Sequence, residues 1–343
     1  MKRTTIKDVA ALAGVSAATV SRVFSKEPSV SLEIASRVKE AAQQLNYRPS
    51  VMARSLTSSR TNLVALVVGR LHNPFDAKLV ESLSQGLQKS GRRLLLVPAD
   101  YGENDPAAMV ALDYQVDGVI VAAGHLSKDS AERFVQLGVP VILYGRTLDA
   151  PGVDCVVADN HLGSRMVGEL FRKTGLKRAA FVRHVRKTFS DDEREAGFKA
   201  GLGPRVACDV LRFTKDTARE LSLGVLSADD RPEAIFCAND VLAFGVIEAA
   251  VQLGLGIPED LKVCGFDDID MASSPFYDLT TLHHSPAEIA EWIVSRLNVR
   301  LSDPESEVVI KRMPVRLKLR RSTPNSSQIG GVAAKNPSRE VIS

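Results

Sequence analysis

Short hydroxyl side chains and one guanidinium gather near the start of the sequence. Ser16, Thr19 and Ser21 lie within one short segment, and Arg22 follows directly. Serine and threonine hydroxyls hydrogen-bond to phosphate oxygens, a contact that fixes a protein on a duplex without reading its bases. An arginine can also donate two hydrogen bonds to the O6 and N7 atoms of guanine. This segment therefore has the side chains that a contact with nucleic acid requires.

The charge of the chain is distributed as such a contact requires. Residues 1–60 carry ten Lys and Arg against four Asp and Glu, whereas residues 61–343 carry 34 against 37. The net charges of these two parts are therefore +6 and −3. A basic segment joined to a mildly acidic body is typical of a nucleic-acid-binding module, although basic segments are often only solvated surface.

A second group of polar side chains follows apolar segments that have the composition of buried strands. Asn73, Arg146, Asn239 and Asp267 each come shortly after such a segment. Ligands of parallel sheets bind beyond the carboxyl ends of the strands. A carboxylate and an arginine can each hold paired hydroxyls of a polyol or sugar-like ligand. The two asparagines could equally cap the helices that follow them.

Positive charge also gathers near these strand ends. It comes from the segment Arg-His-Val-Arg-Lys at 183–187, together with Arg70 and Arg146. One interpretation is a site for an anionic ligand such as a sugar acid or a sugar phosphate. The alternative is that these are loop charges balanced by the acids at 191–195.

Patterns for catalysis, metal binding and export are missing from the sequence. It contains no glycine-rich phosphate loop, no nucleophile elbow and no clustered metal ligands. The four cysteines lie far apart, as expected for buried thiols in a reducing compartment. No apolar run approaches the roughly 20 residues of a membrane span, and no signal peptide is recognisable. We therefore expect a cytoplasmic protein that is not an enzyme and uses no cofactor.

Three predicted helices position the first group of side chains. The segment 5–8 resembles a capping box, and Gly14 ends the first helix. Ser16 caps a second helix over 17–24, and Ser31 caps a third whose apolar residues recur at helical spacing. This arrangement predicts a helix-turn-helix, the second helix of which enters the major groove.

Strands that alternate with helices position the second group. Continuous apolar strands indicate parallel sheets covered on both faces, and the pattern occurs twice. The predicted strands are 63–68, 94–97, 118–123 and 140–144 in a first lobe, and 179–182, 235–238 and 261–265 in a second. We therefore expect an N-terminal all-α head and an α/β body of two doubly wound lobes.

In order and spacing, these motifs resemble the lactose-repressor (LacI/GalR) family of bacterial transcription regulators. In the head the resemblance is carried by residues 6–10, 13–16, 19–23, 30–31 and 45–49. In the body it is carried by Asn-Pro-Phe at 73–75, Arg-x-x-Gly-Phe at 194–198, Ala-Asn-Asp at 238–240, Gly-Phe-Asp-Asp at 265–268 and Leu-Thr-Thr at 279–281. It covers residues 5 to about 323 and implies a body similar to the periplasmic sugar-binding proteins.

For the head, the resemblance implies specific DNA contacts. The residues expected on phosphates are Thr5, Ser16, Thr19, Ser21 and Ser31. The family's principal base readers follow the capping serine, and here they are Ala17 and Ala18, which offer only methyl groups. We therefore expect recognition to depend more on Arg22, on thymine methyls and on DNA shape.

The segment 49–61 is identified by the resemblance as a hinge helix that orders on the operator. A helix of about seven residues is marginal in isolation. Two such helices would pack in the minor groove, where Leu56 would open a base step and the small Ala53 would allow close approach. An ordinary interdomain linker is the alternative.

For the body, the resemblance implies an effector site between the lobes. The residues expected to contact the effector are Phe75, Phe213, Arg194, Asn239 and Asp267, with Asn73 and Arg146 on the cleft wall. An acid that often follows the fourth strand in the family is here Gly145, which puts in doubt any sugar specificity copied from relatives.

The predicted organisation is a helix-turn-helix head (1–48), a hinge (49–61), an effector-binding and dimerisation body (62–323) and a disordered tail (324–343). Lobe one is expected at about 62–159 and 286–303, and lobe two at about 160–285 and 304–323. A homodimer would place two heads on a pseudo-palindromic operator. Binding of a sugar, sugar acid or sugar phosphate would change lobe closure and hence operator affinity.

We expect a repressor of a carbohydrate or related catabolic operon. A periplasmic solute-binding protein would explain the two lobes but not the basic head. An enzyme on a flavodoxin-like sheet would need a catalytic motif that the sequence does not contain.

Overall fold

The computed structural model describes residues 4–24, 30–48, 60–69, 71–99, 105–122 and 126–324. The chain divides into two compact units, Met1–Asn62 and Leu63–Ser343, which we call the head and the body. The predicted hinge residues Ala53 and Leu56 lie outside the described residues, as does the predicted tail beyond residue 324.

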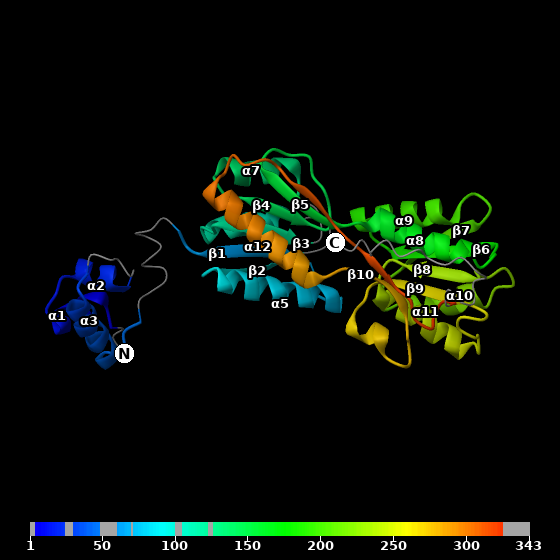
Figure 1. Ribbon diagram of the computed structural model, residues 1–343, viewed down its shortest axis with the longest axis horizontal. Helices are drawn as coiled ribbons and strands as arrows, with labels where there is room; N and C mark the ends of the chain where they lie inside the picture. Colours follow the sequence, from blue (N-terminus) through cyan, green and yellow to red (C-terminus); the bar gives the residue numbers. More distant parts are fainter. Residues whose placement is uncertain are drawn as a thin grey trace, which may run out of the picture. The chain divides into compact units, whose positions relative to one another are not determined.

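The described part of the head contains three helices, α1 (Ile6–Ala13), α2 (Ala17–Phe24) and α3 (Leu32–Gln44) (Figure 1). Their predicted start and stop signals are confirmed. The capping box at α1 is present, and Gly14 adopts a left-handed φ of 65°. The hydroxyl of Ser16 accepts a hydrogen bond from the Thr19 backbone at 3.1 Å, and that of Ser31 accepts one from Ile34 at 3.4 Å.

One small core holds the three helices of the head together. Val9 of α1, Val20 of α2 and Val38 of α3 are completely buried. The guanidinium of Arg37 donates a hydrogen bond of 2.6 Å to the carbonyl of Ala13. A cation at a helix C-terminus is favourable because carbonyl groups there lack partners, so this contact fixes α3 against the end of α1.

The body contains two six-stranded sheets, one in each lobe, with the orders β11-β5-β4-β3-β1-β2 and β12-β10-β9-β8-β6-β7. Lobe one contains β1 (Leu63–Val68), β2 (Arg93–Pro98), β3 (Gly118–Ala122), β4 (Val141–Tyr144), β5 (Val153–Ala158) and β11 (Ile310–Met313). Lobe two contains β6 (Arg178–His184), β7 (Ala207–Phe213), β8 (Ala234–Cys237), β9 (Lys262–Asp267), β10 (Thr280–His283) and β12 (Arg316–Lys318). Only the β10–β12 pair is antiparallel among the described strands, so the predicted doubly wound architecture is confirmed.

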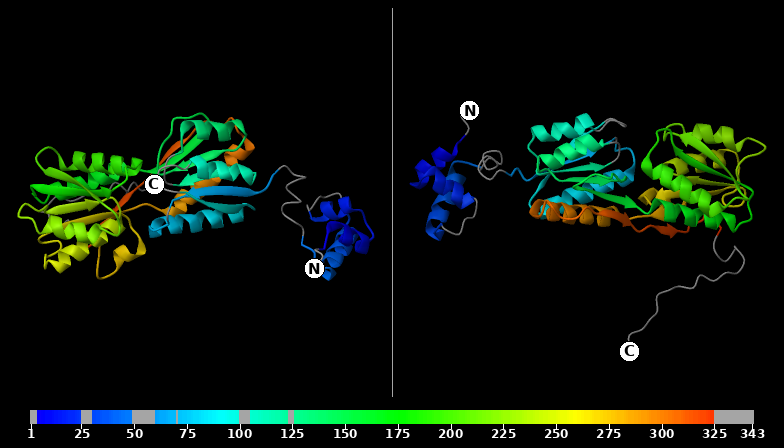
Figure 2. Two further views of the ribbon diagram at one scale, coloured as in Figure 1. Left: turned by 180° about the vertical axis from the view of Figure 1, so that it is seen from behind. Right: turned by 90° about the horizontal axis from the view of Figure 1, so that it is seen from above.

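Helices cover both faces of each sheet (Figure 2). Those of lobe one are α5 (Pro74–Lys89), α6 (Asp105–Asp113), α7 (Lys128–Gln136) and α12 (Pro286–Ser302). Those of lobe two are α8 (Asn160–Arg172), α9 (Phe189–Leu202), α10 (Ala218–Leu226), α11 (Asp240–Gln252) and the 3-10 turn η1 (Asp270–Ser273). Every residue of β3 and β5 is buried, as expected for strands covered on both sides. No helix in the described ranges is long and apolar enough to cross a membrane.

The chain crosses between the lobes after β5, after β10 and after β11. The sequence-based division was wrong at the last crossing, because it assigned residues 304–323 to lobe two. Residues 310–313 instead form β11, which pairs with β5 in lobe one. Three of the four residues of β11 are exposed, so the strand lacks the continuous apolar run by which seven of the other strands were predicted.

A buried ion pair anchors α12 to the sheet of lobe one. Asp154 on β5 is completely buried. Its carboxylate receives hydrogen bonds from Nε and Nη2 of Arg300 at 2.8 and 3.2 Å. Such bidentate pairs are specific in geometry as well as strong. The contact therefore fixes α12 at one position along β5.

Candidate functional site

The exposed surface of α2 carries part of the predicted DNA-binding set. Ser16, Ala18 and Arg22 are exposed, whereas Val20 and Val23 are buried against the other helices. Ala18 and Arg22 are separated by four residues and therefore lie on the same face of the helix. Ala17, Thr19 and Ser21 are partly buried beside this face.

Three of the predicted phosphate contacts lie at helix N-termini. Thr5, Ser16 and Ser31 immediately precede α1, α2 and α3, and all three are exposed. Backbone N–H groups at a helix N-terminus attract anions, so these positions are suited to phosphates. The Thr5 hydroxyl differs from the others because it donates a hydrogen bond to Asp8 at 2.7 Å, and this acid would oppose a phosphate.

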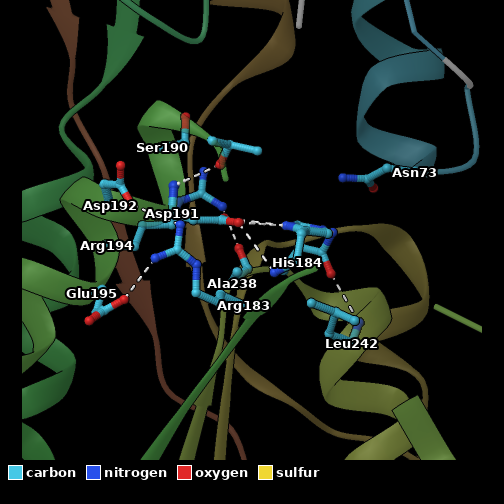
Figure 3. A network of polar contacts seen from close by, with 12 residues as sticks. Asn73, Arg183, His184, Ser190, Asp191, Asp192, Arg194, Glu195, Ala238 and Leu242 are labelled. Carbon is cyan, nitrogen blue, oxygen red and sulfur yellow. Dashed lines mark hydrogen bonds and ion pairs between the residues drawn. The ribbon is translucent and has the colours of Figure 1, made fainter. Parts of the chain in front are cut away.

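In the body, polar side chains converge where strands of the two sheets end. Lobe two contributes His184 at the end of β6, Asn239 after β8, Asp267 at the end of β9 and Arg194 from α9. Figure 3 shows His184 and Arg194 of this group, with Asn73 of lobe one across from them at the start of α5. The structure therefore brings four of the seven predicted effector contacts into one region, which we call the cleft.

The side chain of Asn73 makes one hydrogen bond within lobe one and one with lobe two. Its Oδ1 accepts a hydrogen bond from the Phe75 backbone at 3.1 Å and so caps α5. Its Nδ2 donates to Oδ2 of Asp267 in lobe two at 2.7 Å. The helix cap and the cleft contact were alternatives in the sequence, but the amide group performs both.

Asp267 is held from two directions. Nε2 of His284 lies 3.2 Å from Oδ1 of Asp267, opposite the contact from Asn73. The His284 ring stacks on Phe75 with centroids 4.2 Å apart. Burial lowers the pKa of His284 despite the nearby carboxylate, which favours a neutral ring that donates from Nε2. The φ angle of Asp267 is 107°, a strained conformation that concentrates at functional sites.

Arg194 is fixed by three contacts within lobe two. Its Nε donates to Oδ1 of Asn160 at 2.8 Å, and its Nη1 donates to the carbonyl of Ala238. The guanidinium carbon lies 3.5 Å from the centroid of the Phe266 ring. No residue in the described ranges accepts a hydrogen bond from Nη2, so this edge can bind a ligand.

His184 links two further polar residues of the cleft. Its Nδ1 lies 3.0 Å from Oδ2 of Asp191, and its Nε2 lies 3.1 Å from Nδ2 of Asn239. Asn239 also caps α11 by accepting from the Leu242 backbone at 2.9 Å. Burial would raise the pKa of Asp191, but the hydrogen bond from His184 and the charge of Arg194 hold it below its usual value.

The positive charge predicted at 183–187 is largely neutralised. Arg183 is buried and forms ion pairs with Asp192 at 2.8 Å and Glu195 at 2.9 Å. Lys187 lies 3.6 Å from Asp192. The alternative interpretation of these residues, loop charges balanced by nearby acids, is therefore the one that the geometry supports.

The three remaining predicted residues are Phe75, whose ring stacks on that of His284, Phe213 and Arg146. Phe213 is 4% exposed, belongs to the main core, and lies beside His184 on the adjacent strand. Arg146 is partly buried, and burial lowers its pKa. The acids that affect it lie in lobe one, namely Cys155 and Asp105.

Sequence reasoning missed two side chains of the cleft, Asp76 and Tyr144. Burial and the neighbouring Asp267 raise the pKa of Asp76 to about 7. The pKa of Tyr144 is raised by burial and by the same two carboxylates. Locally, Asp76 looks like any acid in the first turn of a helix, and Tyr144 looks like the end of an apolar strand. Only their position relative to lobe two reveals them.

A metal site is not formed by the described residues, which include no group of three or more His, Cys, Asp or Glu that could hold an ion. The four cysteines are free, and three of them are buried. The cleft has the side chains of a reversible hydrogen-bonding site, namely carboxylates, amides, an arginine edge and aromatic faces.

Two segments of the chain match known protein families. Residues 5–50 match the bacterial regulatory proteins of the lacI family. Residues 169–323 match the periplasmic binding protein-like domain.

Curated relatives match over nearly the whole chain. The HTH-type transcriptional repressor PurR of Actinobacillus pleuropneumoniae is 30% identical over 312 residues, covering 87% of this chain and 90% of the relative. The ribose operon repressor of Halalkalibacterium halodurans is 29% identical over 325 residues, covering 93% of this chain and 97% of the relative.

Solved structures share the fold. A lac repressor dimer bound to operator and an anti-inducer aligns with a TM-score of 0.84 at 24% identity, covering 94% of this chain and 99% of that one. A complex of the transcriptional regulator CelR with cellobiose aligns with a TM-score of 0.68 at 27% identity, covering 93% of this chain and 100% of that one.

Proposed function

Because this chain belongs to the lacI family of bacterial regulatory proteins, we propose that it is a repressor whose hold on operator DNA is set by a small-molecule effector in the cleft. The observation that carries this proposal is the head, where a helix-turn-helix that matches the family presents Arg22 and three helix N-termini on its surface. The relatives include a ribose operon repressor and a sucrose operon repressor, which supports a carbohydrate operon as the target.

In this proposal the head binds DNA through two kinds of contact. Ser16, Thr19, Ser21 and Ser31, with Thr5, bind phosphates and set the register of α2 in the major groove. Arg22 donates to a guanine. Ala17 and Ala18 supply only methyl groups, which favours thymine at the positions that they contact.

Effector binding would act through contacts that join the lobes. Besides the contact between Asn73 and Asp267, Lys78 on α5 lies 3.3 Å from Asp270 in η1. The hydroxyl of Ser190 donates to the carbonyl of Gly145 at 3.0 Å. A ligand that binds both walls of the cleft changes the balance between open and closed lobes by its difference in affinity for the two. We propose that Phe75, Arg194, Asn239 and Asp267 contact this ligand, with Phe213, Asn73 and Arg146 around them.

The lobes would transmit this change through a homodimer. Two heads related by symmetry read the two halves of a pseudo-palindromic operator. Ala53 and Leu56 remain predicted minor-groove contacts of the hinge. The protein would act in the cytoplasm, on the nucleoid, as a regulator and not as an enzyme.

A gel-shift titration tests the proposal. The full-length chain, with DNA from upstream of its own coding region, should retard that DNA at low salt, and the logarithm of the affinity should fall linearly with the logarithm of the salt concentration. Arg22→Ala should weaken specific binding about 5- to 150-fold, since a bidentate base contact contributes about 1–3 kcal/mol of discrimination. Lys39→Ala, an exposed cation on α3, is the matched control.

The two possible failures have different meanings. If no upstream fragment is retarded at low salt, with or without ribose and cellobiose, the chain is not such a regulator. If Arg22→Ala and Lys39→Ala weaken binding equally, the chain binds DNA but α2 does not read it.

A further inference from the structure

Asp76 is a partly buried carboxylate to which no described residue donates a hydrogen bond. It lies in the first turn of α5, a position where acids often serve the helix N-terminus. That task is already performed by Asn73, which accepts the hydrogen bond from the Phe75 backbone. No residue in the described part of the chain donates a hydrogen bond to the Asp76 side chain or pairs with it. The fold of α5 therefore does not account for this carboxylate.

The surroundings of Asp76 place it on the cleft. Its neighbours at the start of α5 line the cleft, since Asn73 donates to Asp267 at 2.7 Å and the Phe75 ring stacks on that of His284. The charges that act on Asp76 most are those of Asp267, His184 and Arg194, all of which belong to lobe two. Asp76 itself belongs to lobe one. Two carboxylates, Asp76 and Asp267, thus come from opposite walls and repel one another, which costs free energy unless a proton or a ligand lies between them.

A second polar group of lobe one also lacks a hydrogen-bond partner among the described residues. Tyr144, at the end of β4, makes no hydrogen bond through its hydroxyl to any described residue. Asp76 and Asp267 both act on it electrostatically. Tyr144 is partly buried, and tyrosine combines an apolar ring with a hydroxyl that seeks a hydrogen-bond partner. A hydroxyl and a carboxylate that both lack a partner among the described residues are therefore available to a ligand.

The charge balance of the cleft opposes anions. Among the described residues, Arg194 is a cation that acts on the carboxylates of both Asp76 and Asp191. Arg183 is already paired with Asp192 and Glu195. Among these described side chains, the carboxylates of Asp76, Asp191 and Asp267 outnumber the guanidinium of Arg194. They would repel a carboxylate or phosphate ligand and favour a neutral or positively charged one.

We propose that Asp76 contacts the effector and accepts a hydrogen bond from a hydroxyl or ammonium group of a neutral or positively charged polyol, and that the cleft selects against anionic effectors. This inference rests on the proposed effector site and names the chemical class of its ligand. Tyr144 is positioned to complete the same contact from lobe one.

The affinity for such a ligand should depend on pH in a defined direction. A ligand donor binds the ionised form of Asp76 better than the protonated form, and the pKa of this group in the empty cleft is about 7. For a neutral hydroxyl ligand, affinity should therefore rise about tenfold between pH 6 and pH 8, because the ionised fraction of Asp76 rises by that factor. The groups that face Asp76 and can also titrate or carry charge are Asp267 on β9, His184 on β6, Arg194 on α9 and Tyr144 on β4. Subtracting the behaviour of Asp76→Asn isolates the contribution of Asp76.

Calorimetry on the full-length chain tests this inference with three classes of probe. Ribose and cellobiose are neutral, glucosamine carries an ammonium group, and gluconate and glucose 6-phosphate are anions. A neutral or ammonium probe should bind best, and Asp76→Ala should weaken its binding about 10- to 100-fold, since hydrogen bonds to charged groups are among the strong ones. Asp76→Asn should match that loss for an ammonium ligand but lose less for a hydroxyl ligand, because the amide oxygen still accepts.

Asp129→Asn is the matched control, since Asp129 is an exposed acid in the first turn of α7. It should leave every affinity and its pH dependence unchanged. Tightest binding by an anion would overturn the inference, as would equal affinities in wild type and Asp76→Ala. Failure of all the probes to bind, with operator binding intact, would overturn it as well. Loss of operator binding by the wild-type chain would instead refute the proposed function.

Discussion

Replacing Asn73 by serine separates the two contacts that its amide makes. Serine is as good an N-cap as asparagine, so α5 should keep its cap. The shorter side chain cannot reach Asp267, to which the asparagine donates at 2.7 Å. Asn73→Ala removes both contacts. The difference in hydrogen-exchange rates between Asn73→Ser and Asn73→Ala therefore measures the contribution of the helix cap. The difference between Asn73→Ser and wild type measures the contribution of the contact between the lobes.

The structure allows a magnitude for each contact. A hydrogen bond to a carboxylate contributes about 1.5–3 kcal/mol, and Asn73 is only partly buried, so we expect the lower end of that range. A loss of about 1.5 kcal/mol shifts the ratio of closed to open lobes about tenfold. Loss of the cap costs about 1 kcal/mol and should be confined to the first turns of α5.

Hydrogen exchange on the full chain measures the two effects in separate peptides. In Asn73→Ser, exchange should accelerate in residues 265–275, which contact α5 across the cleft, while α5 itself stays protected. In Asn73→Ala, both regions should exchange faster. Ser127→Ala removes the hydroxyl that caps α7 and should accelerate exchange there alone. The reasoning fails if Asn73→Ser leaves residues 265–275 at their wild-type rate, or if it exposes α5 as much as alanine does.

Three further variants test the body. Arg300→Leu leaves Asp154 paired with Arg296, which lies 2.8 Å from the same carboxylate, so the single variant should lower the free energy of unfolding in urea by less than the double variant with Arg296→Leu. The double variant leaves the buried charge unpaired and should cost about 3–5 kcal/mol. Arg178→Leu, which breaks pairs with exposed acids, should cost less than about 1 kcal/mol. Gly168→Ala should destabilise the chain in the same assay, because its Cβ would lie 2.3 Å from the carbonyl oxygen of Phe198. The Cβ of Gly224→Ala would meet no atom within 4 Å, so this variant should stabilise α10 by about 0.5–1 kcal/mol. Equal effects of the two variants would contradict this account of the contact between α8 and α9. The pKa of Asp191 is held below its usual value. Its contribution to stability should therefore be complete above the ordinary value near 3.8 and be lost as acid titrates the folded state below that pH. The difference in melting temperature between wild type and Asp191→Asn should shrink on acidification, and a difference that grows would show that this carboxylate is not stabilised by His184.

Local signals were sufficient to predict elements whose physics is local. β1 was predicted at 63–68 and α2 at 17–24, and both match the structure. A continuous apolar run specifies a strand buried on both faces, and a capping serine specifies where a helix begins. Neither signal depends on distant residues.

Strands that are not wholly apolar were missed. Three of the seven residues of β7 are exposed. β10 contains two buried threonines, and the hydroxyl of Thr280 donates to the carbonyl of Arg320 at 2.9 Å, a partner 40 residues away. A polar side chain buried by a distant partner carries no hydrophobic signal, so these strands could not be predicted from periodicity.

The cleft shows the same limit at the level of single residues. Arg194 and Asp267 were predicted from the family motifs and do lie in the cleft. The roles of Asp76 and Asp129 cannot be told apart locally, because each is an acid in the first turn of a helix. They differ only in the side chains that face them. Those that face Asp76 include His184 and Asp267 of lobe two, which lie more than a hundred residues further along the chain.

The three crossings of the chain between the lobes run side by side. The Asp159 backbone donates to the carbonyl of Met313 at 2.9 Å, and His283 pairs with Arg316 in the antiparallel ladder. Three adjacent connections resist sliding and twisting of one lobe against the other, because either motion would stretch one connection and compress another. Rotation about their common line is the motion that they leave free. A ligand bound on both walls therefore has essentially one mechanical variable to change, which is the angle between the lobes.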